Sequence, residues 1–293
     1  MPAEPSRLRA DARGKDVPVA AIARRAGVGV APDAALAASR RLVSLPLPPA
    51  PSASTGCAVP AEQPAWRPSD TELFTTYGDA FVPRRREQIA TVCDLLDAIP
   101  EPHVLDLCCG EGLLSEEYLR RGTAGRVTLL DGSPEMLDKA AARLAPFPGR
   151  WQRVRADIHD RGWRRGPFGG VMTSLAVHHL NGPGKRALYR DLHDMLVPGG
   201  VFVMADLVEP VGARAREVAA AHWDRAVRDA GGDDAAEAFE GAEWNYYRLP
   251  GPDPVDTPSS IAEHLTWLAD AGFADVDLVW LHAGHALFTA TRP

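Results

Sequence analysis

A glycine-containing turn in the first half of the chain has the residue types of a cofactor site. The segment VLDLCCGEGLLS, residues 104–115, reads as a buried strand, a turn and the start of a helix. Asp106 lies in the strand, and Gly110 and Gly112 allow the backbone of the turn to approach a ligand closely. The first turn of the following helix offers free N–H groups to an anion. Alone, such a turn is a weak indication, because several kinds of nucleotide cofactor use it.

Two further carboxylates follow where an adenosine-containing cofactor would need them. Asp131 ends the next apolar segment about twenty residues after the turn, where a carboxylate can accept hydrogen bonds from both ribose hydroxyls. Asp157 ends the third such segment and could accept the adenine amino group. Met136, in the first turn of the helix after Asp131, could cover the purine face.

Each of these residues also has a structural interpretation. Asp106 can cap the turn that follows it, and Asp131 can accept N–H groups at the start of the next helix. Met136 has helical spacing with Ala140 and Leu144, which suits a core position at least as well. The three carboxylates nevertheless stand at the carboxyl ends of strands in one parallel sheet, and α/β sheets bind ligands at that edge. Together they favour the cofactor interpretation.

Two adjacent histidines, His178 and His179, follow the fourth apolar segment and are candidates for catalysis. Histidine is the best general base near neutral pH, and His178 is the more plausible base or acceptor-orienting group. Either ring can equally bond a loop carbonyl. His282 and His285 flank a short turn with no third ligand nearby. The four cysteines contain no C-x-x-C pair. We therefore expect no bound metal and no disulfide framework.

An insertion at residues 208–257 supplies aromatic candidates for substrate contact. They are His222, Trp223, Trp244, Tyr246 and Tyr247. A segment after the fifth strand of a doubly wound enzyme can lie over the ligand edge as a lid, where aromatic side chains suit a flat organic molecule. The alternative is that these residues pack two helices over an exposed sheet edge.

The elements that must position these residues alternate between strands and helices. Strands are expected at residues 102–109, 126–131, 151–157, 169–177, 199–207, 275–281 and 285–292. Helices separate most of them, and residues 75–96 are expected to form one helix that covers the site. The alternation predicts an α/β fold with a doubly wound, mostly parallel seven-stranded sheet and an antiparallel C-terminal hairpin.

Composition divides the chain into two parts. Residues 1–65 hold ten of the 26 prolines and eight lysines and arginines against five acids, which leaves 24 against 34 in the remainder. We expect residues 1–65 to be a disordered or weakly helical extension and residues 66–293 to form one domain. The acidic body argues against nucleic-acid binding. Without a transmembrane run or a signal-peptide core, a cytoplasmic protein that does not bind membranes is expected. The oligomeric state stays open, a homodimer included.

Within the N-terminal extension, residues 16–30 weakly resemble part of a tetracycline-repressor-like helix-turn-helix. A working motif needs an apolar first helix and a recognition helix. Residues 7–15 are too short and polar for the former, and Pro32 falls where the latter should begin. A short isolated helix or a vestigial segment therefore fits these residues better than DNA binding.

The main body resembles the class I S-adenosylmethionine-dependent methyltransferases. The matching segments, in the order of that family, are VLDLCCGEG, LLDGSPEML, RADIHD, VMTSLAVHHL, MLVPGGVFVMADL and LADAGFADVDLVW…ALFTATR. They extend over about residues 77–292, and the resemblance is specific for fold and cofactor rather than for substrate. A nicotinamide dehydrogenase would normally carry G-x-G-x-x-G, whereas Ser115 stands at the third glycine here.

The resemblance implies a set of cofactor contacts. Asp106 and the Gly110–Gly112 turn would hold the methionine part of S-adenosylmethionine, and Asp131 would hold the ribose. The remaining contacts to adenosine and sulfonium would come from Gly132, Ser133, Met136, Asp157, Ile158 and Ser174.

Two features near the turn bear on this resemblance. Tyr77 and Arg84 would close over the cofactor, with Arg84 pairing with its carboxylate, although residues 84–86 can equally be a solvated face. Cys108 departs from the family, which usually has its first glycine there. Because cysteine is small, we expect binding to tolerate it.

We therefore predict an S-adenosylmethionine-dependent methyltransferase acting at oxygen, nitrogen or carbon of a small organic acceptor, as in secondary metabolism. One alternative is an enzyme of the same fold that uses the fixed charge of the cofactor for a non-methylating isomerisation or cyclisation. Another is a regulatory protein that senses the cofactor. Formation of S-adenosylhomocysteine with turnover separates methyl transfer from both.

Overall fold

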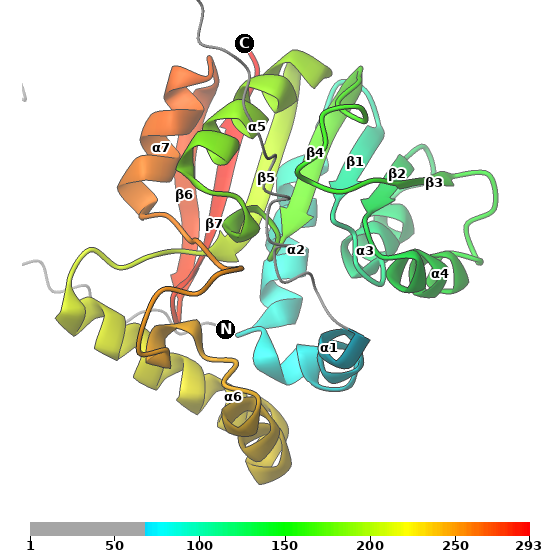
Figure 1. Cartoon of the computed structure of the whole chain (residues 1–293). Helices are drawn as coiled ribbons and strands as arrows, with labels where there is room; N and C mark the ends of the chain where they lie inside the picture. The colour runs from blue at the N-terminus through cyan, green and yellow to red at the C-terminus, as the bar shows by residue number, and fades with distance from the viewer. Residues whose placement is uncertain (1–67) are drawn as a thin grey trace, which may run out of the picture. The chain divides into compact units, whose positions relative to one another are not determined.

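A seven-stranded sheet forms the centre of the computed structural model, which describes residues 68–293 (Figure 1). The strands are β1 His103–Leu107, β2 Arg126–Asp131, β3 Trp151–Arg155, β4 Phe168–Ser174, β5 Leu196–Leu207, β6 Ala274–His282 and β7 His285–Thr291. Their order is β3-β2-β1-β4-β5-β7-β6. Strands β1 to β5 pair in parallel, and β7 is antiparallel to both β5 and β6. The predicted fold class is confirmed. The predictions for residues 1–65 lie outside the described residues.

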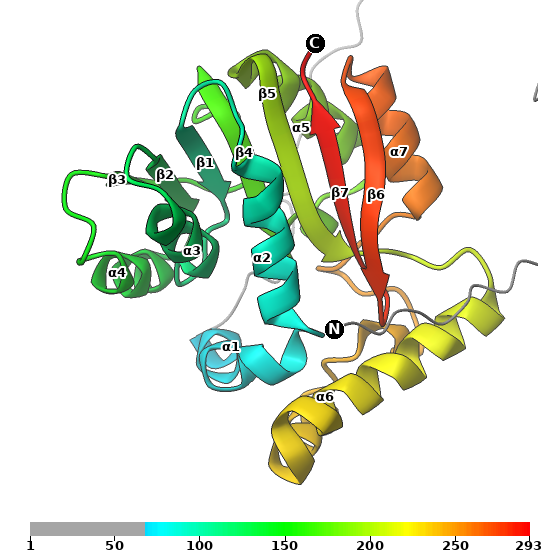
Figure 2. The same cartoon turned by 180° about the vertical axis from the view of Figure 1, so that it is seen from behind.

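Helices cover both faces of this sheet (Figures 1 and 2). They are α1 Pro68–Phe81, α2 Arg85–Leu96, α3 Leu113–Arg121, α4 Pro134–Arg143, α5 Gly182–Met195, α6 Ala213–Gly241 and α7 Ile261–Asp270, with the short 3-10 helices η1 Val177–His179 and η2 Tyr246–Arg248. In one core α5 and α7 pack on the sheet, and in the other α2, α3 and α4 pack on the opposite face. Because the central parallel strands are covered on both sides, they read as continuous apolar runs.

Residues 75–96 form two helices, so the expectation of a single helix is wrong. Pro83 has no backbone N–H to continue a helix, and it disfavours helical backbone in the residue before it. Arg84 then adopts a left-handed conformation with φ 51°. The side-chain amide of Gln88 donates a 2.7 Å hydrogen bond to the Pro83 carbonyl and fixes the corner. The break lets α1 cross the sheet edge while α2 runs along its face (Figure 2).

A third hydrophobic cluster joins α1 and α6 to the ends of the strands. Phe81 of α1 and Trp223 of α6 pack in this cluster together with Leu207 at the end of β5 and Leu175 just after β4. The indole N–H of Trp223 also donates a 2.7 Å hydrogen bond to the carbonyl of Phe81. We call α1 and α6 the helical cap, because they lie at the carboxyl edge of the sheet (Figure 1).

Every helix within residues 68–293 is too short or too polar to cross a membrane.

The left-handed backbone of Arg84 allows a direct test of the helix break. Such backbone costs a non-glycine residue roughly 1–2 kcal/mol, whereas inside a helix alanine is better than glycine by about 1 kcal/mol. We therefore expect Arg84→Gly to unfold in urea with a free energy about 1 kcal/mol above that of Arg84→Ala. The same two substitutions at Arg86, inside α2, should show the opposite order. If the same variant, glycine or alanine, were the more stable one at both positions, the helix break at Arg84 would be contradicted.

Candidate cofactor and acceptor site

The turn after β1 is built from left-handed backbone at Cys108, Gly110 and Gly112, with φ of 56°, 52° and 83°. A Cβ added to Gly112 would come within 3.1 Å of the Ala140 side chain, so the close approach of α4 and the positive φ both favour glycine there. Cys108 adopts the conformation that suits glycine, at a cost of roughly 1–2 kcal/mol. Burial raises the pKa of its thiol well above the ordinary value, which keeps it neutral.

Gly110 forms the part of the turn that is open to a ligand. A Cβ added to Gly110 would meet no atom within 4 Å. Its N–H donates a 2.9 Å hydrogen bond to Oδ2 of Asp131, and the N–H of Ser133 donates at 2.8 Å to Oδ1. Both carboxylate oxygens are thus oriented by backbone donors, and each keeps a lone pair for a further donor such as a ribose hydroxyl. The open turn and this carboxylate fit an adenosine-containing cofactor.

The carboxylate of Asp106 is buried beneath the turn. The Ser115 hydroxyl donates to it at 2.5 Å and links the start of α3 to β1. Burial, opposed by the Ser115 hydrogen bond and assisted by the charge of Asp131, raises the pKa of Asp106 to about 7. Asp106 therefore positions the turn and the helix on which the cofactor's methionine part would lie.

The remaining predicted adenosine contacts differ in exposure. Met136 and Ile158 are buried, at 5% and 6% exposure. The Asp157 side chain is 62% exposed. Its Oδ1 accepts hydrogen bonds from the His159 N–H at 2.8 Å and from His159 Nδ1 at 2.7 Å. Partial burial opposes charge, but these bonds lower the pKa of Asp157, and the charge of His179 lowers it further. An adenine amino group would have to share this carboxylate with His159.

The arginine that faces the turn is Arg85. The Arg84 side chain is 60% exposed and pairs with Glu87 at 3.3 Å, while the half-buried Arg85 lies 3.8 Å from Glu111 within the turn. Tyr77 is partly buried against the hydrophobic cluster of the helical cap. Sequence reasoning missed Arg85, because the break before α2 decides which of the three consecutive arginines turns inward.

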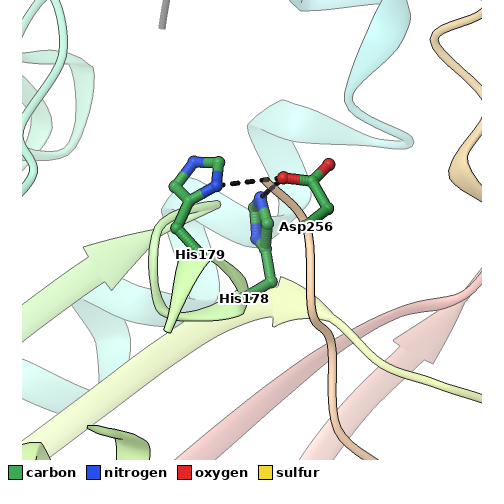
Figure 3. A group of neighbouring side chains, drawn as sticks. All are labelled: His178, His179 and Asp256. Carbon is green, nitrogen blue, oxygen red and sulfur yellow. Dashed lines mark ion pairs between the residues drawn. The ribbon is translucent and has the colours of Figure 1, made fainter. Parts of the chain in front are cut away.

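His178, His179 and Asp256 form a group at the end of β4, which we call the histidine–aspartate cluster (Figure 3). Oδ1 of Asp256 lies 3.0 Å from Nδ1 of His179 and 3.5 Å from Nε2 of His178. Asp256 comes from the loop before α7, and this loop is anchored by Thr257, whose N–H and hydroxyl donate to the His178 carbonyl at 2.8 and 3.1 Å. Burial disfavours the charged form of Asp256, but both histidines lower the pKa of this carboxyl group. No local pattern marks Asp256 in the sequence.

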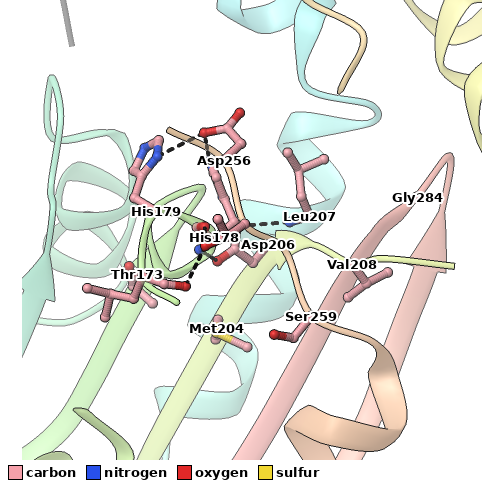
Figure 4. Close-up of polar contacts among 12 residues, drawn as sticks. Thr173, His178, His179, Met204, Asp206, Leu207, Val208, Asp256, Ser259 and Gly284 are labelled. Carbon is pink, nitrogen blue, oxygen red and sulfur yellow. Dashed lines mark hydrogen bonds and ion pairs between the residues drawn. The ribbon is translucent and has the colours of Figure 1, made fainter. Parts of the chain in front are cut away.

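A buried carboxylate orients His178 from below (Figure 4). Asp206, at the end of β5, accepts a hydrogen bond from Nδ1 of His178 and another, at 3.0 Å, from the His178 backbone N–H. Burial opposes the charged imidazole, but Asp206 and Asp256 raise the pKa of His178 above the ordinary value. Sequence reasoning missed Asp206, although it stands next to last in an apolar strand and Asp131 stands last in another.

The aromatic residues of the insertion divide into two groups. Trp223 and Tyr247 are 2% and 5% exposed and pack within the helical cap. The Tyr247 hydroxyl lies 2.6 Å from the carbonyl oxygen of Gly284. Trp244 and Tyr246 are half-buried in contact with the same cluster, and His222 is exposed. The contacts of Trp223 and Tyr247 are those of helix packing.

The amino-acid sequence of the chain is similar to those of known methyltransferases. Residues 104–200 fit the sequence profile of a methyltransferase domain. The chain is 28% identical over 235 residues to trans-aconitate 2-methyltransferase of Streptomyces avermitilis, covering 76% of each protein. It is 32% identical over 111 residues, 38% of the chain, to an uncharacterized methyltransferase of Synechocystis, and the match spans 50% of that relative. These matches, together with the fold and the turn after β1, show a methyltransferase domain that is similar to the class I S-adenosylmethionine-dependent methyltransferases.

Solved structures agree with the fold of this methyltransferase. An O-methyltransferase family protein of Burkholderia thailandensis superposes with a TM-score of 0.57 at 17% identity, over 76% of this chain and 60% of that one. The methyltransferase uses S-adenosylmethionine, and its predicted cofactor residues lie along one stretch of the carboxyl edge. There β2 ends at Asp131, β1 leads into the turn at Gly110, and β4 ends at Ser174. The individual contacts stay predictions.

Gly110 provides a test of the cofactor site with a matched control. In Gly110→Ala the new methyl group enters the open side of the turn, so we expect at least tenfold weaker S-adenosylmethionine binding by calorimetry. Gly149→Ala has the same left-handed backbone, with φ 74°, and the same free space, but lies in the loop between α4 and β3. Both should lose roughly 1–2 kcal/mol of stability, and only the first should lose affinity. Unchanged affinity in Gly110→Ala and in Asp131→Ala would refute the assignment.

The raised pKa of Asp106 predicts a pH dependence of stability. Between the unfolded pKa near 4 and the folded value of about 7, the native state holds a proton that the unfolded chain has lost. Stability should therefore fall as pH rises through this window. We expect Asp106→Asn, which stays neutral, to show a smaller fall in urea unfolding between pH 5 and 8 (about the span of this window). The exposed Asp138→Asn serves as control and should follow the wild type.

Proposed function

We propose that this methyltransferase acts on a small organic acceptor, at an oxygen atom that carries a proton. The helical cap is the observation that carries the proposal. One hydrophobic cluster joins α1 and α6 to the carboxyl ends of β4 and β5, beside the predicted cofactor residues and the histidine–aspartate cluster. A site beneath two helices suits a small molecule and excludes water, which aligned methyl transfer requires.

The cap also reaches the cofactor side of the edge. The ammonium group of Lys139 in α4 donates a 3.0 Å hydrogen bond to the Thr75 hydroxyl in α1. Arg85, at the start of α2, lies 3.2 Å from Asp79 in α1 and 3.8 Å from Glu111 in the turn. These contacts hold α1 across the end of the sheet from α4 to α6, so the cap would cover cofactor and acceptor together.

S-adenosylmethionine supplies an activated methyl group on a positively charged sulfur. The chain itself has to align the acceptor and deal with its proton. The histidine–aspartate cluster suits this task, because imidazole exchanges protons near neutral pH. Sequence reasoning favoured His178, but that ring is buried and bonded to Asp206, whereas the His179 side chain is 24% exposed. We therefore assign acceptor contact to His179, with His178 holding the cluster in place.

The relatives and the charge of the chain support a small acceptor. The relative that shares 76% of its length with this chain carries the name of a small organic acid, trans-aconitate. Residues 66–293 have ten more acids than lysines and arginines. A surplus of negative charge disfavours association with polyanions such as nucleic acids.

Turnover with a pool of small molecules tests the proposal. Purified protein with S-adenosylmethionine and a mixture of phenols, hydroxy acids and carboxylic acids should form S-adenosylhomocysteine and a product heavier by one methyl group in mass spectrometry. His179→Gln should lower turnover roughly 10²-fold or more and leave cofactor affinity unchanged. His193→Gln, at the C-terminal end of α5, should keep full turnover. Methyl incorporation confined to protein or RNA would contradict a small acceptor.

A further inference from the structure

We propose that the histidine–aspartate cluster binds a divalent transition-metal ion of the zinc class, through Nε2 of His178, Nδ1 of His179 and Oδ1 of Asp256. These three atoms lie within 4.8 Å of one another (Figure 3). Ligands about 2.0–2.2 Å from a tetrahedral ion are about 3.4 Å apart. The separations of Asp256 from the two rings, 3.0 and 3.5 Å, already match this value. For joint ligation the two ring nitrogens, which lie within 4.8 Å of each other, have to approach, and this requires the partly exposed His179 ring to turn.

Asp206 orients the first of these ligands. A carboxylate only accepts hydrogen bonds, so the contact with Asp206 places the proton of a neutral His178 ring on Nδ1. The lone pair of Nε2 then points toward Asp256 (Figure 4). A carboxylate that fixes the far nitrogen of an imidazole is the usual support of a metal-ligating histidine. In this cluster the support is buried and held by the backbone of η1 and β5.

The second observation is a buried ring nitrogen without a hydrogen bond. Nδ1 of His179 is a buried atom without a hydrogen-bond partner within residues 68–293, although it lies 3.0 Å from Oδ1 of Asp256. Leaving a buried polar atom unpaired costs on the order of 1–3 kcal/mol. Nε2 of His178 and Oδ1 of Asp256 both present lone pairs to the same space, and lone pairs attract only across a shared proton or cation. One cation satisfies all three atoms.

The ligand set selects the ion and its use. Two imidazole nitrogens and one carboxylate oxygen suit zinc, iron, cobalt or nickel, whereas magnesium and calcium prefer oxygen ligands throughout. Three protein ligands leave a coordination position open, as in catalytic rather than structural sites. A cation there would lower the pKa of a hydroxyl group that approaches it. This step rests on the proposed function, and it narrows the acceptor to molecules with a coordinating oxygen, such as hydroxy acids.

A cobalt titration tests the site without reference to turnover. Tag-free protein carrying Cys57→Ser, which removes the one cysteine outside the described residues, is freed of metal with a chelator and titrated with CoCl₂. We expect one equivalent to bind and to give the visible bands of a four-coordinate ion with nitrogen and oxygen ligands. Calorimetry with ZnCl₂ should show micromolar or tighter binding, and MgCl₂ should not compete. The alternative is that a protonated His178 imidazole, rather than a metal ion, compensates the charges of Asp206 and Asp256. In that case no cobalt spectrum would appear.

Variants assign the binding to the cluster. Asp256→Asn and His179→Gln remove partly exposed ligands and should weaken Co²⁺ binding at least a hundredfold with an unchanged circular dichroism spectrum. Asp206→Asn should weaken it about 10–100-fold through loss of orientation. His222 and His282 form another pair of neighbouring histidines, with ring centroids 6.5 Å apart. As controls, His222→Gln and His282→Gln should bind Co²⁺ as tightly as the wild type.

The two proposals fail in different ways. Absence of binding, or binding that survives Asp256→Asn, overturns the metal site even if the pool assay shows full turnover. Stoichiometric binding lost in Asp256→Asn supports the metal site, and if every small acceptor then fails, only the proposed function falls.

Discussion

The buried carboxylate of Asp206 connects the parts from which the acceptor side is made. At 1% exposure an isolated carboxylate would be very costly, but Asp206 accepts hydrogen bonds from the Leu207 N–H, the His178 N–H and the His178 ring. Burial opposes this charge, yet the His178 ring lowers the pKa of Asp206. The imidazole in turn fixes η1, and Thr257 bonds to the His178 carbonyl. One buried charge thereby connects β5, the segment after β4 and the loop that carries Asp256.

A second buried charge holds the same loop from the other side. The Lys185 ammonium, on α5, donates hydrogen bonds to the Thr257 carbonyl and to the Ser259 hydroxyl. Burial, partly offset by the negative charge of Asp206, lowers the pKa of Lys185 to about 8. Because the loop is held by the backbone carbonyl of His178 on one side and by an ammonium on the other, Asp256 stands at a defined place although it belongs to no helix or strand. The acceptor side therefore depends on buried charges, while the cofactor side depends on backbone donors around Asp131.

The sheet and the cofactor half of the site could be predicted from the sequence, because both depend on local patterns of residues. Strands buried on two faces are continuous apolar runs, Ser133 followed by Pro134 marks the start of α4, and parallel strands bring their terminal carboxylates to one edge. The acceptor half depends on tertiary contacts that leave no local trace. Asp256 follows a stretch rich in proline and glycine, and the orientation of Arg85 follows from one left-handed residue before it. The spacing of apolar residues predicts neither the position of Asp256 nor the orientation of Arg85.

Cys108 shows how the two halves meet. Its left-handed backbone is strained for a non-glycine residue, and strain of this kind persists only where the surroundings over-determine it. The next residue, Cys109, donates its N–H to the Leu130 carbonyl at 2.9 Å, and its carbonyl accepts the N–H of Gly112 at 2.9 Å. The Cys108 side chain meanwhile packs against the core beneath α5, the helix that also carries Lys185. Backbone bonds from the cofactor side and packing on the acceptor side thus hold this residue in place, so the turn keeps its open geometry before any ligand arrives.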